Sequence, residues 1–341
     1  MITAHFTNDT CMKNRCVAAL VLSLLALTSI AWTENARGQT NLVRVGILSF
    51  FPVGDNPGSE PWVGPVREIL AARGWVDGKN VSFEYRSAQS DPSKFLKAAK
   101  ELVEADVNVI YALSAPALHA AYAITRTVPI VAVDFTTDPI ARGYIETYSR
   151  PGGNVTGVFL DAPEFAGKWF DLLKATVPNL SHVAVLWDPG PGDSHLFAVR
   201  GVAESLDIKL QVLEVHQPRD IDKAFEAFSV KTQAVVILPS PLSYNQSSRL
   251  ATLALNYRLP ATSIFTEFTE TGGTLAYGPE TTLTDERIAI LVAKVLGGSK
   301  PANLPVERPT KFRLSVNLKT AEVLGLNIPQ SILLRADEVI R

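Results

Sequence analysis

Short apolar strands alternate with amphipathic helices along most of the chain, and this alternation restricts the fold more than any other feature. The segment 43–49 is a continuous apolar strand, of the kind that is buried on both faces of a parallel sheet. The segment 92–105 is typical of an amphipathic helix, because Phe95, Ala99 and Leu102 recur at helical spacing. Alternation of this kind predicts an α/β protein with doubly wound parallel sheets and right-handed crossovers.

The predicted elements form two similar arrays and a different tail. The first array has strands at 43–49, 80–86, 107–113 and 129–133, with helices at 61–73, 92–105 and 115–125. The second has strands at 182–187, 209–215, 234–238 and 260–264, with helices at 194–206, 220–228 and 243–257. The tail has a strand at 273–277, a helix at 283–296, an extended segment at 306–316, a short helix at 318–324 and a final segment at 333–340.

The stretch 151–159 separates the two arrays. Pro151, Gly152 and Gly153 interrupt regular structure, and a strand at 155–160 and a helix at 163–176 follow. With 341 residues the chain is long enough for two domains. We therefore expect either a crossover between two lobes, which acts as a hinge beside a ligand-binding cleft, or an ordinary loop within one large domain.

The N-terminal segment 1–38 has the pattern of a signal peptide. Lys13 and Arg15 precede an apolar run at 17–31, whose 15 residues are short for a membrane span. We expect cleavage between residues 32 and 41 and export to the periplasm, with an uncleaved anchor as the alternative. Both cysteines, Cys11 and Cys16, lie in this leader, so the mature chain is expected to have no disulfide and no cysteine chemistry.

Composition and motifs argue against several functions. A formal net charge of −2 gives no electrostatic footprint for nucleic acid. The sequence contains no phosphate-binding loop, no G-x-G-x-x-G after the first strand and no G-x-S-x-G. The five histidines show no metal-ligand spacing. We therefore expect no enzymatic activity, no cofactor, no metal and no nucleic-acid partner.

Ligands of open parallel sheets bind at the carboxyl ends of the strands, so the residues that follow each predicted strand are the candidate ligand-binding residues. They combine aromatic rings, hydroxyls and carboxylates. In the first array they are Ser49, Phe50, Phe51, Ser114, Ala115, Asp134, Phe135, Thr137 and Asp138. In the second array they are Asp188, Ser240, Phe265, Glu267 and Tyr277.

Ser114 gives the most specific of these hypotheses. A serine cap followed by free backbone N–H groups can hold an anion at a helix N-terminus, and a ligand carboxylate would suit it. Plain helix capping is the alternative. Asp134, Asp138 and Asp188 could bind an ammonium group or could simply start turns. The aromatic rings could stack on an apolar ligand body or could belong to the core or the rim.

Several segments together resemble the substrate-binding proteins of ABC transporters, in the group with tryptophan- and tyrosine-binding lipoprotein-like members. The likeness extends from about residue 43 to the end of the chain. The matching segments are 74–81 (GWVDGKNV), 150–157 (RPGGNVTG), 183–189 (VAVLWDP), 272–279 (GGTLAYGP), 300–306 (KPANLPV), 309–312 (PTKF) and 317–321 (NLKTA).

The resemblance implies a type I periplasmic-binding-protein fold, in which two Rossmann-like lobes are joined by a three-crossing hinge. The crossings are expected near 153–158, 277–280 and 301–306. Lobe 1 would then comprise residues 43–155 plus 280–300, and lobe 2 residues 156–279 plus 301–341. The implied function is the capture of a small molecule and its delivery to an inner-membrane ABC permease with a separate ATPase, by a monomeric protein. A ligand-sensing module of a membrane receptor is the alternative.

This chain departs from the family pattern at Thr137, Ser240 and Thr266, where relatives commonly carry glycine, an acidic residue and arginine. The missing acid at Ser240 leaves fewer charges to neutralise a ligand ammonium. We therefore expect an amino acid or an aromatic or other carboxylic acid as the ligand, with a preference for acids that lack an amine. A sugar is the second possibility, because aromatic platforms with polar neighbours also suit sugars.

Overall fold

Two β-sheets organise the chain. The computed structural model describes residues 42–51, 63–160 and 162–341, and the predicted leader with Cys11 and Cys16 lies outside them. Residues Val43–Arg341 cluster as one unit by their contacts. Within it we call the five-stranded sheet with its covering helices lobe 1, and the seven-stranded sheet with its helices lobe 2.

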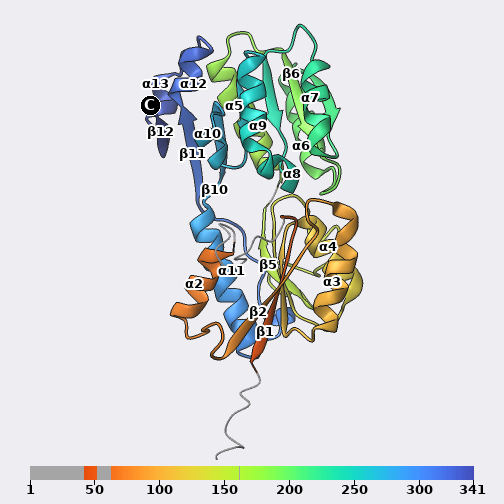
Figure 1. The fold of residues 1–341 in the computed structure, drawn as a ribbon. Helices are drawn as coiled ribbons and strands as arrows, with labels where there is room; N and C mark the ends of the chain where they lie inside the picture. The colour runs from red at the N-terminus through yellow and green to blue at the C-terminus, as the bar shows by residue number, and fades with distance from the viewer. Residues whose placement is uncertain (1–41, 52–62, 161) are drawn as a thin grey trace, which may run out of the picture. The chain divides into compact units, whose positions relative to one another are not determined.

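Lobe 1 is a parallel sheet with the strand order β2-β1-β3-β4-β5. Its strands are apolar because helices cover both faces. The helices α3 and α4 cover one face, while α2 and α11 cover the other (Figure 1). The bounds are β1 (Val43–Ser49), α2 (Gly64–Ala72), β2 (Val81–Ser87), a 3-10 turn (Pro92–Lys94), α3 (Phe95–Glu104), β3 (Val109–Leu113), α4 (Ala115–Ile124), β4 (Ile130–Asp134), β5 (Val155–Phe159) and α11 (Thr281–Leu296).

Lobe 2 has the strand order β12-β11-β10-β9-β8-β6-β7. One core lies under α5 and α6, and a second lies under α7 and α9. The bounds are α5 (Ala162–Thr176), β6 (His182–Trp187), α6 (Ser194–Ser205), β7 (Lys209–Glu214), α7 (Pro218–Glu226), β8 (Ala234–Ile237), α8 (Pro241–Asn245), α9 (Ser247–Asn256), β9 (Ala261–Ser263), α10 (Glu267–Glu270), β10 (Leu275–Pro279), β11 (Phe312–Asn317), α12 (Leu318–Val323), α13 (Gln330–Leu333) and β12 (Glu338–Ile340). A 3-10 turn (Pro301–Asn303) between α11 and β11 still belongs to lobe 1, because Gly152 N donates to Ala302 O.

Three local predictions were wrong. The lobe 2 sheet is not wholly parallel, because β11 returns from lobe 1 and pairs antiparallel with β10. The helix predicted at 243–257 is two helices, α8 and α9, because the Ser240 cap starts the first helix early and Gln246 lies between them. The extended segment predicted at 306–316 is interrupted: Glu307 bridges Val158, and β11 begins only at Phe312.

The first and third crossings between the sheets lie later in the chain than predicted, whereas the second lies within the predicted range 277–280. β5 pairs with β4, so the first crossing follows Phe159 rather than residue 155. The second crossing is at Glu280, between β10 and α11. The third lies between Glu307 and Phe312, because Glu307 still bonds β5: its N–H donates to Gly157 O at 2.9 Å, and its carbonyl accepts from Phe159 N at 2.9 Å.

Glycine is required at one position in β5 and one in β10, the strands that precede the first two crossings, because each strand lies very close to its neighbour there. A Cβ on Gly157, whose φ is +151°, would lie 2.0 Å from the carbonyl oxygen of Ala132. A Cβ on Gly278 would lie 1.8 Å from the carbonyl oxygen of Ile264. Both distances are far too short for a non-bonded contact between carbon and oxygen, so β5 and β10 can approach their neighbours only with glycine there.

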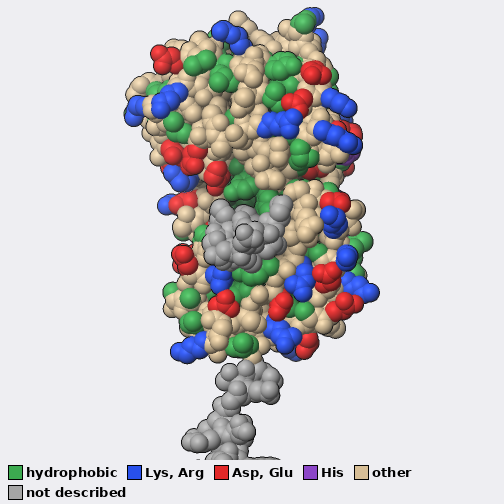
Figure 2. All heavy atoms as spheres, in the orientation of Figure 1, with side chains coloured by type: hydrophobic (Ala, Val, Ile, Leu, Met, Phe, Trp, Pro, Cys, Tyr) green, Lys and Arg blue, Asp and Glu red, His purple; other side chains and the backbone are tan. Residues whose placement is uncertain are grey.

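The described surface carries charges of both signs. Figure 2 shows Lys and Arg side chains interspersed with Asp and Glu side chains on the face drawn, with no field of one sign. Among residues 42–51, 63–160 and 162–341, no helix has the length and apolar character needed to cross a bilayer.

Candidate ligand-binding site

Ser114 starts α4 in an unusual backbone conformation. It is the N-cap residue, and its Oγ accepts a hydrogen bond from Ala117 N at 3.4 Å. Its φ of +140° with ψ of 167° lies in a region that is essentially restricted to glycine and costs about 1–3 kcal/mol. Ala115 is buried, whereas Ser114 is partly exposed. A strained serine at an accessible helix N-terminus is consistent with a ligand contact and also with simple capping.

The carboxylate of Asp134 is occupied by its own loop. Its Oδ1 accepts from Thr136 N at 2.8 Å and Thr137 N at 3.2 Å, and its Oδ2 accepts from Thr137 Oγ1. Burial raises the pKa of Asp134, and these hydrogen bonds oppose the rise. Asp138 behaves similarly, since its Oδ1 accepts from Ile140 N at 2.9 Å. Both aspartates and Thr137 thus shape the turn after β4, and the Asp134 carboxylate accepts hydrogen bonds from this turn at both of its oxygens.

Asp188 and Ser240 lie together at the carboxyl ends of β6 and β8. Asp188 Oδ1 accepts from Gly190 N at 2.9 Å, and burial raises the pKa of Asp188, opposed by hydrogen bonds that include one with Ser240. Ser240 forms a capping box with Ser243: its N–H donates to Ser243 Oγ at 2.9 Å, and its Oγ accepts from Ser243 N at 3.0 Å. The hollow that they line holds only about 10 Å³, room for about one water molecule.

Two neighbouring phenylalanines after β1 have opposite surroundings. Phe50 is 5% exposed and packs in the lobe 1 core, 6.2 Å from the ring of Phe95. The ring of Phe51 lies 5.6 Å from the ring of Tyr244, which belongs to α8 of lobe 2. The buried Ser49 supports this turn, because its Oγ donates to Phe51 O at 3.2 Å. Phe51 therefore joins the strand-end loops of the two sheets, whereas Phe50 is a core residue.

Tyr244 is the centre of an aromatic cluster that the sequence did not reveal. Its ring also lies 4.9 Å from that of Phe265, at an interplanar angle of 77°. We call Phe51, Tyr244 and Phe265 the cleft triad, since they come from the carboxyl ends of strands in both sheets. Burial raises the pKa of Tyr244 to about 12, and the negative charge of Glu267 adds to this effect.

Glu267 and Asp285 bring two carboxylates to the same region. Glu267 begins α10, and its Oε2 is buried with no hydrogen-bond partner among the described residues. Burial raises the pKa of Asp285, on α11 of lobe 1, to about 7, and repulsion from Glu267 contributes. Burial also raises the pKa of Glu267. Within the described chain, neither carboxylate takes part in an ion pair.

Tyr277 and Phe135 were predicted at the site and have other surroundings. The ring of Tyr277 packs 5.8 Å from Phe165 and 6.2 Å from Phe312, next to the lobe 2 core under α5. The carbonyl of Phe135 bonds Nε2 of His195 at 2.5 Å, so this residue links the end of β4 to α6. Neither ring contacts a member of the cleft triad among the ring contacts found in the described chain.

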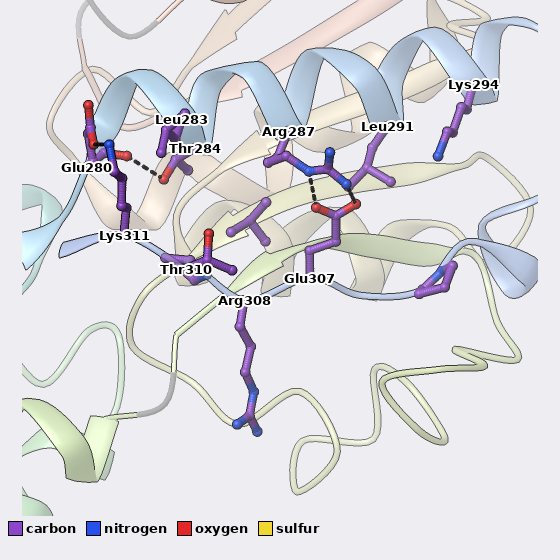
Figure 3. Close-up of a pocket in the computed structure, with 13 residues that line it drawn as sticks. Glu280, Leu283, Thr284, Arg287, Leu291, Lys294, Glu307, Arg308, Thr310 and Lys311 are labelled. Carbon is purple, nitrogen blue, oxygen red and sulfur yellow. Dashed lines mark hydrogen bonds and ion pairs between the residues drawn. The ribbon is translucent and has the colours of Figure 1, made fainter.

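A large hollow beside the second and third crossings is separate from all of these residues. It has a volume of about 690 Å³. Figure 3 shows Leu283, Arg287, Leu291 and Lys294 along one side of α11, directed toward the segment 305–311. Arg287 holds Glu307 through its Nε and its Nη2, and Lys311 lies 3.6 Å from Glu280. No residue that we predicted at the ligand site lines this hollow.

The sequence reasoning missed Tyr244 and Asp285. Tyr244 lies four residues after the Ser240 cap, in the first turns of a helix whose start was placed too late. Asp285 lies next to Thr284 on a helix that was predicted correctly, but its side chains were not considered. One signal could have predicted Asp285. The first turn of a helix that follows a crossing lies at the carboxyl end of the sheet, so a polar residue there is a candidate for the site.

The fold defines the structural class of this protein. Two Rossmann-like lobes with mainly parallel sheets and three crossings form the type I periplasmic-binding-protein fold. The chain belongs to the family of ABC transporter substrate binding proteins, whose sequence profile matches residues 49–340. This is a family of solute-binding proteins rather than of enzymes.

Individual relatives agree with this assignment. A tyrosine-binding protein of Clostridioides difficile (strain R20291) is 21% identical over 263 residues, which cover 76% of this chain and 75% of the relative. A conserved domain protein of Vibrio cholerae has a TM-score of 0.80 at 24% identity, over 88% of this chain and 100% of that one. The ABC domain in complex with L-Trp from Streptococcus pneumonia has a TM-score of 0.79 at 22% identity, over 88% and 100%.

Metal chemistry finds no support in the described part of the chain. No three or more His, Cys, Asp or Glu side chains are grouped there so as to hold a metal ion.

Proposed function

We propose that this chain is the periplasmic solute-binding component of an ABC importer, exported by cleavage of the leader 1–38 and working as a monomer. It captures a small organic molecule, an amino acid or an aromatic or other carboxylic acid, in the cleft between its lobes. It then delivers this ligand to an inner-membrane permease that works with a separate ATPase. Membership of the substrate-binding family supports this reading.

The contact between Phe51 and Tyr244 is the observation that carries the proposal. The two rings, 5.6 Å apart, come from the loop that follows β1 and from α8, which follows β8 in the other sheet. A ligand packed against the cleft triad touches residues of both lobes. Such a ligand stabilises the closed arrangement in proportion to its differential affinity for that arrangement.

Relatives support the ligand class. One is described as a tyrosine-binding protein, and another was solved in complex with L-Trp. Both ligands combine a carboxylate with an aromatic body. The strained Ser114 at the N-terminus of α4 suits a carboxylate, and the cleft triad suits an aromatic body.

Mass spectrometry of small molecules released by denaturing the purified protein tests the proposal directly. We expect a carboxylate-bearing molecule with an apolar or aromatic body, recovered intact. Recovery of a sugar, or of a chemically altered ligand after incubation, would contradict the proposed class.

Hinge closure is tested separately by small-angle scattering, with and without the ligand identified in that way. The three crossings at Phe159, Glu280 and 308–311 are the motivation. We expect the radius of gyration to fall on ligand saturation. An unchanged radius would remove the hinge from the proposed mechanism while leaving ligand capture intact.

A further inference from the structure

A hollow of about 350 Å³ lies in lobe 2, between α5, the strands β10 and β11 and the turn before β12. We call it the lobe 2 hollow. The partly buried rings of Tyr277 and Phe312 line it, together with Leu172 and Leu314. No member of the cleft triad is among its described lining residues, and its volume lies within the range of small-molecule sites. The lobe 2 hollow is therefore a candidate for a binding site separate from the cleft.

The two rings of the lobe 2 hollow are held in place by buried neighbours. The ring of Phe165, a residue that is 2% exposed, lies 5.8 Å from that of Tyr277 and 5.2 Å from that of Phe312. The carbonyl of Tyr277 accepts a hydrogen bond at 3.1 Å from Nε1 of Trp169, whose side chain is fully buried. Tyr277 also lies opposite Leu314 in the paired strands β10 and β11. The aromatic wall is therefore preorganised, and a ligand has little of it left to order.

Two cations on the lining have no partner within the described chain. Lys168 of α5 and Arg335 of the turn before β12 are exposed, and neither side chain makes an ion pair or a hydrogen bond with a described residue. Asp337 also belongs to the lining, and its Oδ2 accepts from Leu314 N at 2.8 Å. The described lining thus carries two positive charges and one negative charge.

The larger hollow beside α11 is charged differently. There Arg287 is paired with Glu307, and Lys311 is paired with Glu280, so two of its cations are neutralised within the chain (Figure 3). In the lobe 2 hollow the two cations are left for an occupant, and aromatic rings share the lining with them. Ammonium and guanidinium groups hold carboxylates by charge-assisted hydrogen bonds, and aromatic rings pack against other rings. The lining therefore suits a ligand that combines a ring with an anionic group.

We propose that the lobe 2 hollow is an accessory binding site for a small aromatic anion, of which an aromatic carboxylate is the simplest kind. The ring of the ligand packs against Tyr277 and Phe312, and its carboxylate accepts hydrogen bonds from Lys168 and Arg335. Arg335 contributes more than Lys168, because a guanidinium can hold a carboxylate through two parallel hydrogen bonds, whereas an ammonium acts as a point charge.

The accessory site adjoins the hinge without spanning it. α5 follows the first crossing, β10 precedes the second and β11 follows the third, so all the lining elements belong to lobe 2. A ligand that contacts one lobe keeps the same contacts in the open and the closed arrangement, and therefore does not shift the balance between them. The cleft and the accessory site can then be filled at the same time and independently.

Isothermal titration calorimetry of the purified protein tests the inference, with benzoate as the probe. Benzamide is the matched compound without the charge, and cyclohexanecarboxylate is the matched compound without the aromatic ring. We expect benzoate to bind about ten- to a hundredfold more tightly than benzamide, because the charge-assisted hydrogen bonds are lost with the amide. We expect an advantage of about two- to tenfold over cyclohexanecarboxylate.

Three variants locate the binding event. Arg335→Gln should weaken benzoate binding by about tenfold or more, and Lys168→Gln should weaken it by a smaller factor. Phe312→Leu, which keeps an apolar side chain without the ring, should weaken it by about two- to tenfold. The control is Lys174→Gln, because Lys174 is exposed on the same helix and is not among the lining residues. The two exposed cations have no partner to lose, so their variants should melt at the temperature of wild type.

The outcomes are decisive because the variants do not touch the cleft triad. The accessory site is wrong if benzoate fails to bind at about 10 mM, or if both cation variants bind it as tightly as wild type. Benzoate binding that survives in all three variants belongs to another site, which also contradicts the proposal. If the cation variants weaken binding and Phe312→Leu does not, the hollow binds anions without regard to a ring, and the aromatic ligand class is wrong. None of these results alters the proposed capture of a solute in the cleft.

Discussion

His195 and Phe135 join α6 of lobe 2 to the end of β4 in lobe 1: Nε2 of the imidazole lies 2.5 Å from the Phe135 carbonyl oxygen. A carbonyl can only accept, so Nε2 carries the proton and donates it. His195 is 5% exposed, and burial lowers its pKa to about 4, so the ring is neutral at physiological pH. The second ring nitrogen, Nδ1, is buried with no hydrogen-bond partner among the described residues and bears no proton.

Acid should destabilise the protein through His195. Its pKa is depressed in the folded state, so the unfolded chain binds more protons between pH 6.5 and about 4, and stability falls as pH falls through this window. The difference is worth on the order of 2–3 kcal/mol near pH 4.5. Urea unfolding at about pH 7.5 and about pH 4.5 measures it.

The His195→Gln protein should lose most of this pH dependence, because glutamine keeps a donor and cannot titrate. His216→Gln is the matched control, since the His216 side chain is 59% exposed. A His195→Gln protein with the acid sensitivity of wild type would contradict the assignment.

Gly157→Ala should be severely destabilising. Its Cβ would lie 2.0 Å from Ala132 O, and φ of +151° is unfavourable for alanine. Overpacking and backbone strain together predict a loss on the order of 3 kcal/mol or more. Denaturant unfolding followed by circular dichroism measures the loss.

Gly167→Ala provides the control for that substitution. Gly167 lies inside α5, and a Cβ there meets nothing within 4 Å, so alanine should be neutral or should stabilise the helix by about 0.5–1 kcal/mol. Equal effects at the two glycines would show that the close approach of β5 to β4 is not what requires Gly157.

The ion pair between Arg287 and Glu307 should stabilise the third crossing measurably. The pair is bidentate, and Glu307 is 20% exposed, so a double-mutant cycle with Arg287→Met and Glu307→Gln should give a coupling of about 1 kcal/mol. The coupling should fall in about 0.5 M salt. The pair of Lys97 and Glu101, at 4.0 Å with Lys97 82% exposed, should show almost none.

Two replacements of Ser114 test whether its side chain holds the ligand carboxylate. Proline, which would remove the N–H, cannot adopt a φ of +140°, so Ser114→Gly and Ser114→Ala are the useful variants. Glycine should be the more stable of the two, because it accepts this conformation without strain. If Oγ holds the ligand carboxylate, both should lose about 1.5–3 kcal/mol of binding, roughly ten- to a hundredfold. Binding as tight as wild type in both would exclude that contact.

The fold was largely predictable from sequence because its strands are buried on both faces. The apolar run 45–48 in β1 predicts a buried strand, and the helical spacing of Phe95, Ala99 and Leu102 in α3 predicts an amphipathic helix. The crossing points were less predictable. The sequence of residues 155–159 suits a strand in either sheet, and only the pairing of this strand with β4 assigns it to lobe 1.

The site was less predictable than the fold, because side-chain direction at a strand end depends on tertiary contacts. Phe50 and Phe51 are identical neighbours, yet one packs on Phe95 and the other on Tyr244. The carboxylate of Asp134 was expected at the ligand and is occupied by the two threonines that follow it. Asp285 comes from α11, far along the chain from the other site residues, and no local sequence pattern predicts that it lies near them.

The late position of α11 has a consequence for synthesis. This helix covers one whole face of the lobe 1 sheet, together with α2, yet roughly 120 residues separate it from β5. At a translation rate of about 5–20 residues per second, the completed set of five strands waits on the order of 6–24 seconds for its cover. A chain that stops before Thr281 therefore exposes the part of this apolar sheet face that α2 does not cover, and is prone to aggregation although every strand of the sheet is present.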